Sequence, residues 1–282
     1  MQKIFIIILI SFGFATICFP QEFFDERTAF TSAIKLNNGS IEPYINEYIY
    51  RFDNANYNVY QEDEFELAKT VKELNNEIKN IPLDKEFFIK YSATFGKYNF
   101  ETNEFDFQPF TDETFIEILN FAFAPRSSTN TSVQLHFSNG KEVSSLPMEF
   151  DKANFLVKMR KDKRSGKVDR TIHLKVSYVL KDYIEIEDVS ESRKKITLFA
   201  EITKVEAYEN PGFLSDPLAT ISTEYFLKQQ REKQEAEKAK ADAQINKEAE
   251  TVKALNKYLS EKDVDKDLKA QIMHTTVEYY KE

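Results

Sequence analysis

The 282-residue sequence has little of what several protein classes require. A single cysteine excludes a disulfide framework and zinc or iron–sulfur sites built on cysteine. Only six glycines are present, and no Walker A loop or G-x-G-x-x-G motif, so a phosphate-binding loop is not expected. The three histidines, His136, His173 and His274, lack the i, i+4 spacing of ligands on a metal-binding helix. We therefore predict no metal site and no cofactor, and no local motif identifies a catalytic residue.

The composition that remains is that of a globular, acidic protein. Hydrophobic residues make up 41% of the chain, with 25 Phe and 14 Tyr, which is ample for a core and too apolar for a disordered chain. The length predicts one or two globular units. The formal net charge of −9 argues against nucleic acid as a partner.

Residues 1–20 have the pattern of a secretory signal peptide. Lys3 is followed by an uncharged run from Ile4 to Phe19, which is short for a membrane span. We therefore expect an exported protein, located in the periplasm, in the cell envelope or outside the cell. Cys18 is a candidate lipidation site, but Ile17 stands where a small residue is usual, so attachment to a membrane is expected only if Cys18 is acylated.

Residues 22–82 show helical periodicity. Between Ile41 and Phe52, apolar residues at i, i+3, i+4, i+7, i+8 and i+11 form one helical face. A second helix is predicted near 62–80, ended by Pro82, and a shorter one near 25–36. We interpret these faces as the core-packing side of an N-terminal helical layer.

Residues 84–221 change to the alternating pattern of β-strands. The longest alternating runs are at 87–95, 171–180 and 196–203, and shorter ones are at 133–137, 155–159 and 184–187. Residues 115–123 fit either a helix or a strand. Such runs predict an antiparallel sheet with one buried face, and because helices precede strands, the fold class is α+β.

Residues 222–282 form a tail rich in Lys, Glu and Ala. Residues 228–257 contain no Gly or Pro, a composition typical of a long polar helix, and a short second helix is predicted near 263–280. Ile245, Ala249, Val252 and Leu259 fit coiled-coil core positions, but Asn256 interrupts the pattern. The tail is therefore either a solvated helix of its own domain or a helix for self-association.

The segment between Lys158 and Arg170 has the highest local charge, with seven basic side chains and two acidic ones. Ser165-Gly166 predicts a hairpin turn between a strand at 155–159 and one at 171–180. Two interpretations stay open: a positive patch that meets an anionic partner or glycan, or a solubilising loop beside edge strands. In the first, the contact residues are Arg160, Lys161, Lys163, Arg164, Lys167 and Arg170.

Two further groups of residues have alternative interpretations. The aromatic cluster comprises Tyr98, Phe100, Phe105, Phe107 and Phe110. Its alternation, with a turn at 102–104, favours cross-strand packing in the core, and a ligand groove is the other interpretation. Glu185 and Glu187 share one strand face about 6–7 Å apart, a separation that glycosidase carboxylates also use. A chain so rich in acidic residues also produces such pairs on the wet face of a sheet.

Three segments resemble a known family: FGKYNFETNEF (95–105), Leu146-Pro147-Met148, and NFLVKMRKDKRSGKVDRTIHLKVSYVL (154–180). They are similar to a group of exported bacterial proteins, the domain-of-unknown-function family 4852, over roughly residues 60–210. The matching motif residues are Gly96, Tyr98, Phe100 and Glu101, followed by Gly166, Val168 and Arg170. The resemblance implies no activity and no catalytic residues.

The sequence thus supports two hypotheses from different classes. The first is a non-enzymatic envelope protein that presents its β-rich domain to another protein or an extracellular ligand, with possible contacts through the basic loop and the tail helix. The second is a hydrolase or small-ligand-binding protein with a pocket on the sheet face, where His136 or His173 meets a carboxylate.

Overall fold

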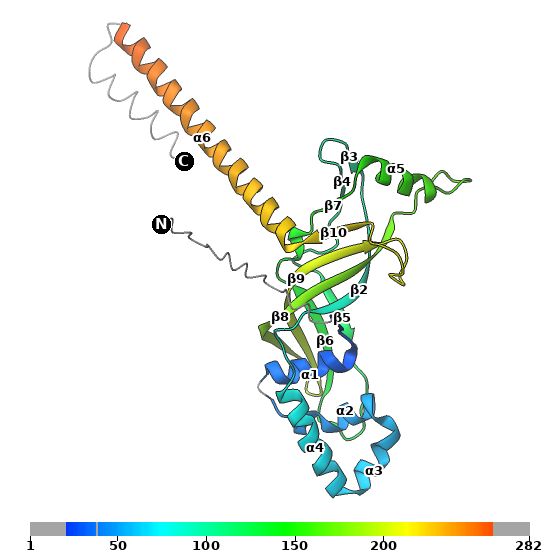
Figure 1. The fold of residues 1–282 in the computed structure, drawn as a ribbon. Coiled ribbons are helices and arrows are strands. Elements are labelled where there is room, and N and C mark those ends of the chain that lie inside the picture. Colours follow the sequence, from blue (N-terminus) through cyan, green and yellow to red (C-terminus); the bar gives the residue numbers. More distant parts are fainter. Residues whose placement is uncertain (1–20, 38, 262–282) are drawn as a thin grey trace, which may run out of the picture. The chain divides into compact units, whose positions relative to one another are not determined.

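The computed structural model describes residues 21–37 and 39–261 (Figure 1). Contacts divide the chain into one unit that ends at Thr223 and another that begins at Glu224. The first unit is a mixed α+β structure with a large sheet, which confirms the predicted fold class at that level. The predicted signal peptide with Cys18, and the predicted helix near 263–280 with His274, lie outside the described residues.

The main sheet of the first unit has seven strands. In spatial order they are β1 (Glu22–Phe23), β2 (Phe87–Thr94), β8 (Thr171–Ser190), β9 (Arg193–Tyr208), β6 (Asn130–Phe137) and β5 (Phe115–Leu119), and β10 (Ala219–Ser222) pairs with β9. β1 pairs with β2 in parallel, and so does β6 with β9. The prediction of an antiparallel sheet is wrong for these two pairs, because alternation reports a buried face and not the direction of the neighbouring strand.

The β8–β9 hairpin supplies the centre of the core. Leu174 and Val176 from β8 and Leu198 and Ala200 from β9 point to the same side of the sheet and are fully buried. Tyr178 is buried beside them, and within the described residues its hydroxyl has no hydrogen-bond partner. Burial raises the pKa of Tyr178 well above its ordinary value.

The described part of residues 22–82 is mostly helical. It contains α1 (Glu26–Leu36), α2 (Ile45–Phe52), α3 (Tyr57–Glu62) and α4 (Glu64–Lys79), with 3-10 turns at Glu42–Tyr44 and Asn54–Asn56. The helices predicted near 25–36 and 62–80 are confirmed, and the side chains of Asp25 and Asp63 cap them. The helix predicted from Ile41 begins instead as a 3-10 turn. α1 packs against β5, β6 and β8.

A small three-stranded sheet lies at the end of the first unit remote from α3 and α4 (Figure 1). Its strands are β3 (Tyr98–Asn99), β4 (Glu104–Asp106) and β7 (Ser145–Pro147), and α5 (Phe150–Met159) follows β7. The strand predicted at 155–159 is therefore wrong. Phe150, Ala153 and Val157 also fit a helical period, and a short apolar run does not distinguish the two structures.

In the second unit, the described residues form one long helix, α6 (Thr223–Glu261), of 39 residues. At 1.5 Å per residue this is about 58 Å of helix. Ile245, one of the predicted coiled-coil positions, is exposed. No helix within residues 21–37 and 39–261 is long and apolar enough to cross a membrane.

Candidate functional site

An open groove of about 210 Å³ lies between the small sheet and α5. We call it the aromatic groove; it is lined by Tyr98, Phe100, Phe105, Phe150, Ala153, Asn154, Val157 and Arg170. The rings come from the β3–β4 hairpin and from the start of α5, and Arg170 immediately precedes β8. Three segments of the chain therefore meet at one largely apolar surface.

The β3–β4 hairpin holds its rings in defined positions. The Tyr98 hydroxyl donates to the backbone oxygen of Met148 at 2.9 Å, and the Tyr98 ring packs edge-on against Phe105 with centroids 5.0 Å apart. Asn103 adopts φ 56° in the turn, which asparagine tolerates better than most residues. Gly96 allows the close approach of β4, because a Cβ there would lie 2.8 Å from the Cβ of Asp106. The floor of the groove is therefore rigid.

The rim of the groove is exposed. Phe100 is 73% exposed and Phe150 is 49% exposed, although both are large apolar side chains. Their ring centroids lie 6.1 Å apart, and Tyr98 lies 5.3 Å from Phe100 and 6.4 Å from Phe150. Full burial of a side chain of this size stabilises a fold by about 1.5–3 kcal/mol of free energy. At the rim this stabilisation is not gained, because the rings remain in contact with solvent.

One face of α5 forms the opposite wall. Phe150, Ala153, Asn154 and Val157 are spaced i, i+3, i+4 and i+7, so they share that face. Asn154 contributes a neutral polar side chain among the rings. This wall was not predicted from the sequence, because the alternation at 155–159 indicated a strand over part of α5. The signal was the helical spacing from Phe150 onward.

The predicted contact residues of the basic loop (residues 158–170) divide into two groups. Arg170 stacks 5.3 Å from the Phe95 ring centroid and donates to the Gly96 backbone oxygen. Arg160 follows α5 and donates to the backbone oxygens of Thr171 and Glu209. These two side chains hold the fold together. The other four, Lys161, Lys163, Arg164 and Lys167, are exposed.

The turn within the basic loop forms where it was predicted, but it follows α5 rather than a strand. The Asp162 carboxylate accepts hydrogen bonds from the backbone N–H groups of Arg164 at 3.0 Å and Ser165 at 2.5 Å. The hydrogen bond from the Ser165 backbone N–H is the main cause of the lowered pKa of Asp162. Gly166 has φ 70°, in the region that favours glycine. The exposed cations therefore project from an ordered turn.

The predicted aromatic cluster is divided between core and groove. Phe107 and Phe110 are buried, and so is Phe105, which nevertheless reaches the groove floor. Tyr98 is partly exposed and Phe100 is mostly exposed. Core packing is therefore confirmed for Phe105, Phe107 and Phe110. Tyr98 and Phe100 line the aromatic groove, and the binding of a ligand there stays a prediction.

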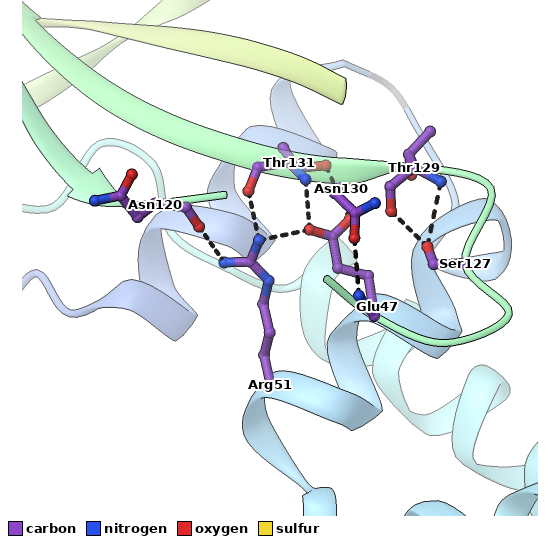
Figure 2. A network of polar contacts seen from close by, with 8 residues as sticks. Glu47, Arg51, Asn120, Ser127, Thr129, Asn130 and Thr131 are labelled. Carbon is purple, nitrogen blue, oxygen red and sulfur yellow. Dashed lines mark hydrogen bonds and ion pairs between the residues drawn. The ribbon is translucent and has the colours of Figure 1, made fainter. Parts of the chain in front are cut away.

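A buried ion pair lies elsewhere in the unit (Figure 2). Glu47 on α2 is fully buried, and Arg51, one turn later, lies 2.9 Å from its Oε1. Glu47 also accepts hydrogen bonds from the backbone N–H of Thr131 at 2.5 Å and from its hydroxyl at 3.0 Å. Arg51 donates to the backbone oxygens of Asn120 at 2.8 Å and Thr131 at 2.7 Å.

Burial dominates the electrostatics of this pair. It raises the pKa of the Glu47 carboxyl, against the opposing effects of Thr131 and Arg51, and it lowers the pKa of the Arg51 guanidinium. Both carboxylate oxygens are occupied by donors of the protein itself. We interpret the pair as a structural link that holds α2 against the start of β6, rather than as a site for a ligand.

The histidines of the described residues lie apart. His136 packs between the Phe115 and Phe199 rings, and its Nδ1 lies 3.3 Å from the Thr114 backbone oxygen. The Nδ1 of His173 lies 3.0 Å from the Oγ of Ser92 on the neighbouring strand. Among residues 21–37 and 39–261, no group of three His, Cys, Asp or Glu residues could hold a metal ion.

Of the two glutamates on β8, Glu187 forms an ion pair with Lys195. Glu185 is exposed. This is the arrangement expected on the solvent-exposed face of a sheet.

Residues 41–159 match the model of a domain of unknown function (DUF4852). The match supports the resemblance found in the sequence, but it begins and ends earlier than residues 60–210. It includes α2, the β3–β4 hairpin and α5, and it stops before the turn that contains Gly166. No curated protein and no solved structure matches the chain.

Proposed function

We propose that the protein is an exported, non-enzymatic binding module. Its aromatic groove receives an apolar side chain of a partner protein, and the exposed cations of the basic loop attract carboxylates that flank this side chain. The observation that carries the proposal is the exposed rim, with Phe100 73% exposed above a floor fixed by hydrogen bonds. Aromatic anchors in a preformed pocket contribute much of the affinity of protein interfaces.

Charge supports the choice of partner. Seven basic and two acidic side chains lie between Lys158 and Arg170 in a chain whose net charge is −9. Cations near an apolar groove accelerate and orient the approach of an acidic segment. The same cations repel a basic segment.

The export of the module rests on the signal-peptide pattern of residues 1–20. In this proposal a helical N-terminal layer packs on the main sheet through α1. The long polar C-terminal helix serves as a stalk or a coiled-coil contact between copies. Cell fractionation with N-terminal sequencing tests export: we expect a mature chain that begins close to residue 20, and a cytosolic chain that retains Met1 would contradict it. Mass spectrometry of that chain shows whether Cys18 carries lipid.

A random peptide library selected on the immobilised protein tests the groove. We expect enrichment of peptides with a Phe, Tyr or Leu flanked by Asp or Glu. Phe100→Ala should weaken their binding at least about tenfold. Phe123→Ala is the matched control, since Phe123 is 77% exposed and does not line the groove. Enrichment of basic peptides, or equal losses in both variants, would contradict the proposal.

A hydrolase is the second candidate function, and the Ser92–His173 pair favours it. A serine hydroxyl 3.0 Å from an imidazole nitrogen is the arrangement from which nucleophilic catalysis starts. Ser92 also lines an open pocket with Thr94, Gln108 and Thr171. Hydrolysis of p-nitrophenyl esters tests this candidate. Turnover that is lost in both Ser92→Ala and His173→Ala would favour it over the binding module.

A further inference from the structure

The corner between α3 and α4 is a second surface on which an apolar side chain is left exposed. We call Glu62–Glu66 the acidic corner; its sequence is Glu-Asp-Glu-Phe-Glu. Phe65 is 79% exposed, and three glutamates and one aspartate surround it in the sequence. The corner therefore presents one aromatic ring within a group of carboxylates.

The corner is held rigidly. The Asp63 carboxylate accepts hydrogen bonds from the backbone N–H groups of Phe65 at 3.0 Å and Glu66 at 3.1 Å, which fixes the first turn of α4. The Tyr57 hydroxyl on α3 donates to the Pro125 backbone oxygen at 2.7 Å. Because the corner is already ordered, little conformational entropy is lost when Phe65 is bound.

We propose that the partner of the aromatic groove is the acidic corner of a second copy of this chain. This inference rests on the proposed function of the groove, and charge complementarity carries it. The corner supplies an aromatic ring flanked by carboxylates in the sequence, and the groove supplies exposed rings. The basic loop, with its exposed Lys161, Lys163 and Arg164, begins just after Val157 and ends at Arg170, and both of these residues line the groove. Phe65 packs onto the exposed faces of the Phe100 and Phe150 rings, and the glutamates face the basic loop.

The positions of the two surfaces determine the kind of assembly. Within the first unit, the acidic corner lies at one end and the small sheet with α5 at the other, with the main sheet between them (Figure 1). A corner therefore cannot enter the groove of its own copy. The contact joins different surfaces of two copies, head to tail, so an open assembly keeps one free groove at one end and one free corner at the other. The product is an open chain of copies, or a ring where the rotation between neighbours closes it.

Sedimentation velocity of the full-length protein tests this arrangement. We expect the average mass to rise with protein concentration and to fall as salt is added, because salt screens exposed charges. The corner variant Phe65→Ser and the groove variant Phe100→Ser should each weaken the head-to-tail contact at least about tenfold. The control Phe123→Ser should behave as the wild type.

Mixing the two variants gives a sharper result. The corner variant keeps an intact groove and the groove variant keeps an intact corner, so the mixture forms one contact and cannot extend. We expect one additional association step, between one copy of each variant, that neither shows alone. Identical sedimentation of wild type, both variants and their mixture would overturn the proposal.

A photocrosslinker placed at position 65 separates this contact from any association through α6. We expect intermolecular crosslinks to α5 or to the β3–β4 turn, and crosslinks only to α6 would overturn the proposal. If Phe65→Ser leaves association unchanged while Phe100→Ala still abolishes the binding of library peptides, the proposed function stands and self-association fails. If Phe65→Ser leaves association unchanged and Phe100→Ala leaves peptide binding unchanged, both the proposed function and the proposed self-association fail.

Discussion

The Glu47–Arg51 pair and the aromatic groove depart from ordinary burial in opposite directions. The pair places two charges inside the protein, and the described hydrogen bonds occupy both carboxylate oxygens. The groove places large apolar rings at the surface, with Phe100 and Phe150 open to solvent. The buried carboxylate is paired within the chain, although the Arg51 Nε has no hydrogen-bond partner among the described residues, whereas the rings of Phe100 and Phe150 stay exposed. An anomaly without internal compensation is the better indication of a partner.

The largest effect is expected from removing one charge of the buried pair. Glu47→Ala leaves the Arg51 guanidinium buried without its counter-ion, which should lower the free energy of unfolding by about 3–5 kcal/mol. Urea denaturation at pH 7 measures this. The double variant Glu47→Leu/Arg51→Met should recover most of the loss, because it leaves no unpaired charge. Equal losses of unfolding free energy in the single and double variants would show that the two side chains stabilise the fold through packing alone.

The second prediction compares two rings of one hairpin. Phe105 is buried, so Phe105→Ala should cost about 3–5 kcal/mol of unfolding free energy. Phe100 is mostly exposed, so Phe100→Ala should change it by no more than about 0.5 kcal/mol. Thermal and urea unfolding measure both. A large loss in Phe100→Ala would mean that this ring stabilises the fold, and the groove would lose its main support as a binding site.

The third prediction concerns a buried polar group that lacks the compensation seen at Glu47. The hydroxyl of Tyr178 is buried without a hydrogen-bond partner in the described residues. Tyr178→Phe removes that hydroxyl and keeps the ring, so it should raise the free energy of unfolding by about 1 kcal/mol. A clear destabilisation in urea would show that the hydroxyl has a partner, such as an internal water.

The smallest change in unfolding free energy is expected from a change of pH. Burial raises the pKa of Glu47 in the folded state, so the folded protein binds a proton more readily there than the unfolded chain. The stability that this group contributes is fully present below the unfolded pKa and is lost as pH rises through the folded pKa. The difference in unfolding free energy between wild type and Glu47→Gln should therefore shrink as pH rises from 4 to 7. A difference that grows would mean that Arg51 outweighs burial.

The sequence predicted those elements whose signal is local. Alternation predicted most of β2 and β8 and half of β9, and Ser165-Gly166 predicted the turn of the basic loop. The direction of the β6–β9 pairing was not predictable, because it depends on contacts between distant segments. The strand predicted at 155–159 failed because the same apolar residues also fit a helix.

The site was less predictable than the fold, for a physical reason. By helical periodicity Glu47 and Arg51 lie away from the apolar face of α2, and they become buried only because Asn120 and Thr131 pack against that side. Phe100 and Phe105 belong to the same aromatic run, and sequence alone does not distinguish the exposed ring from the buried one. Exposure is a property of the assembled fold.

The turn of the basic loop has an evolutionary consequence. The turn is formed by the Asp162 carboxylate, by backbone hydrogen bonds and by the φ of Gly166. The side chains of Lys163 and Arg164 are exposed. Mutation can therefore change these charges one at a time without altering the backbone that carries them. Under the proposed function, such substitutions would change which partner the groove selects while the groove itself stays the same.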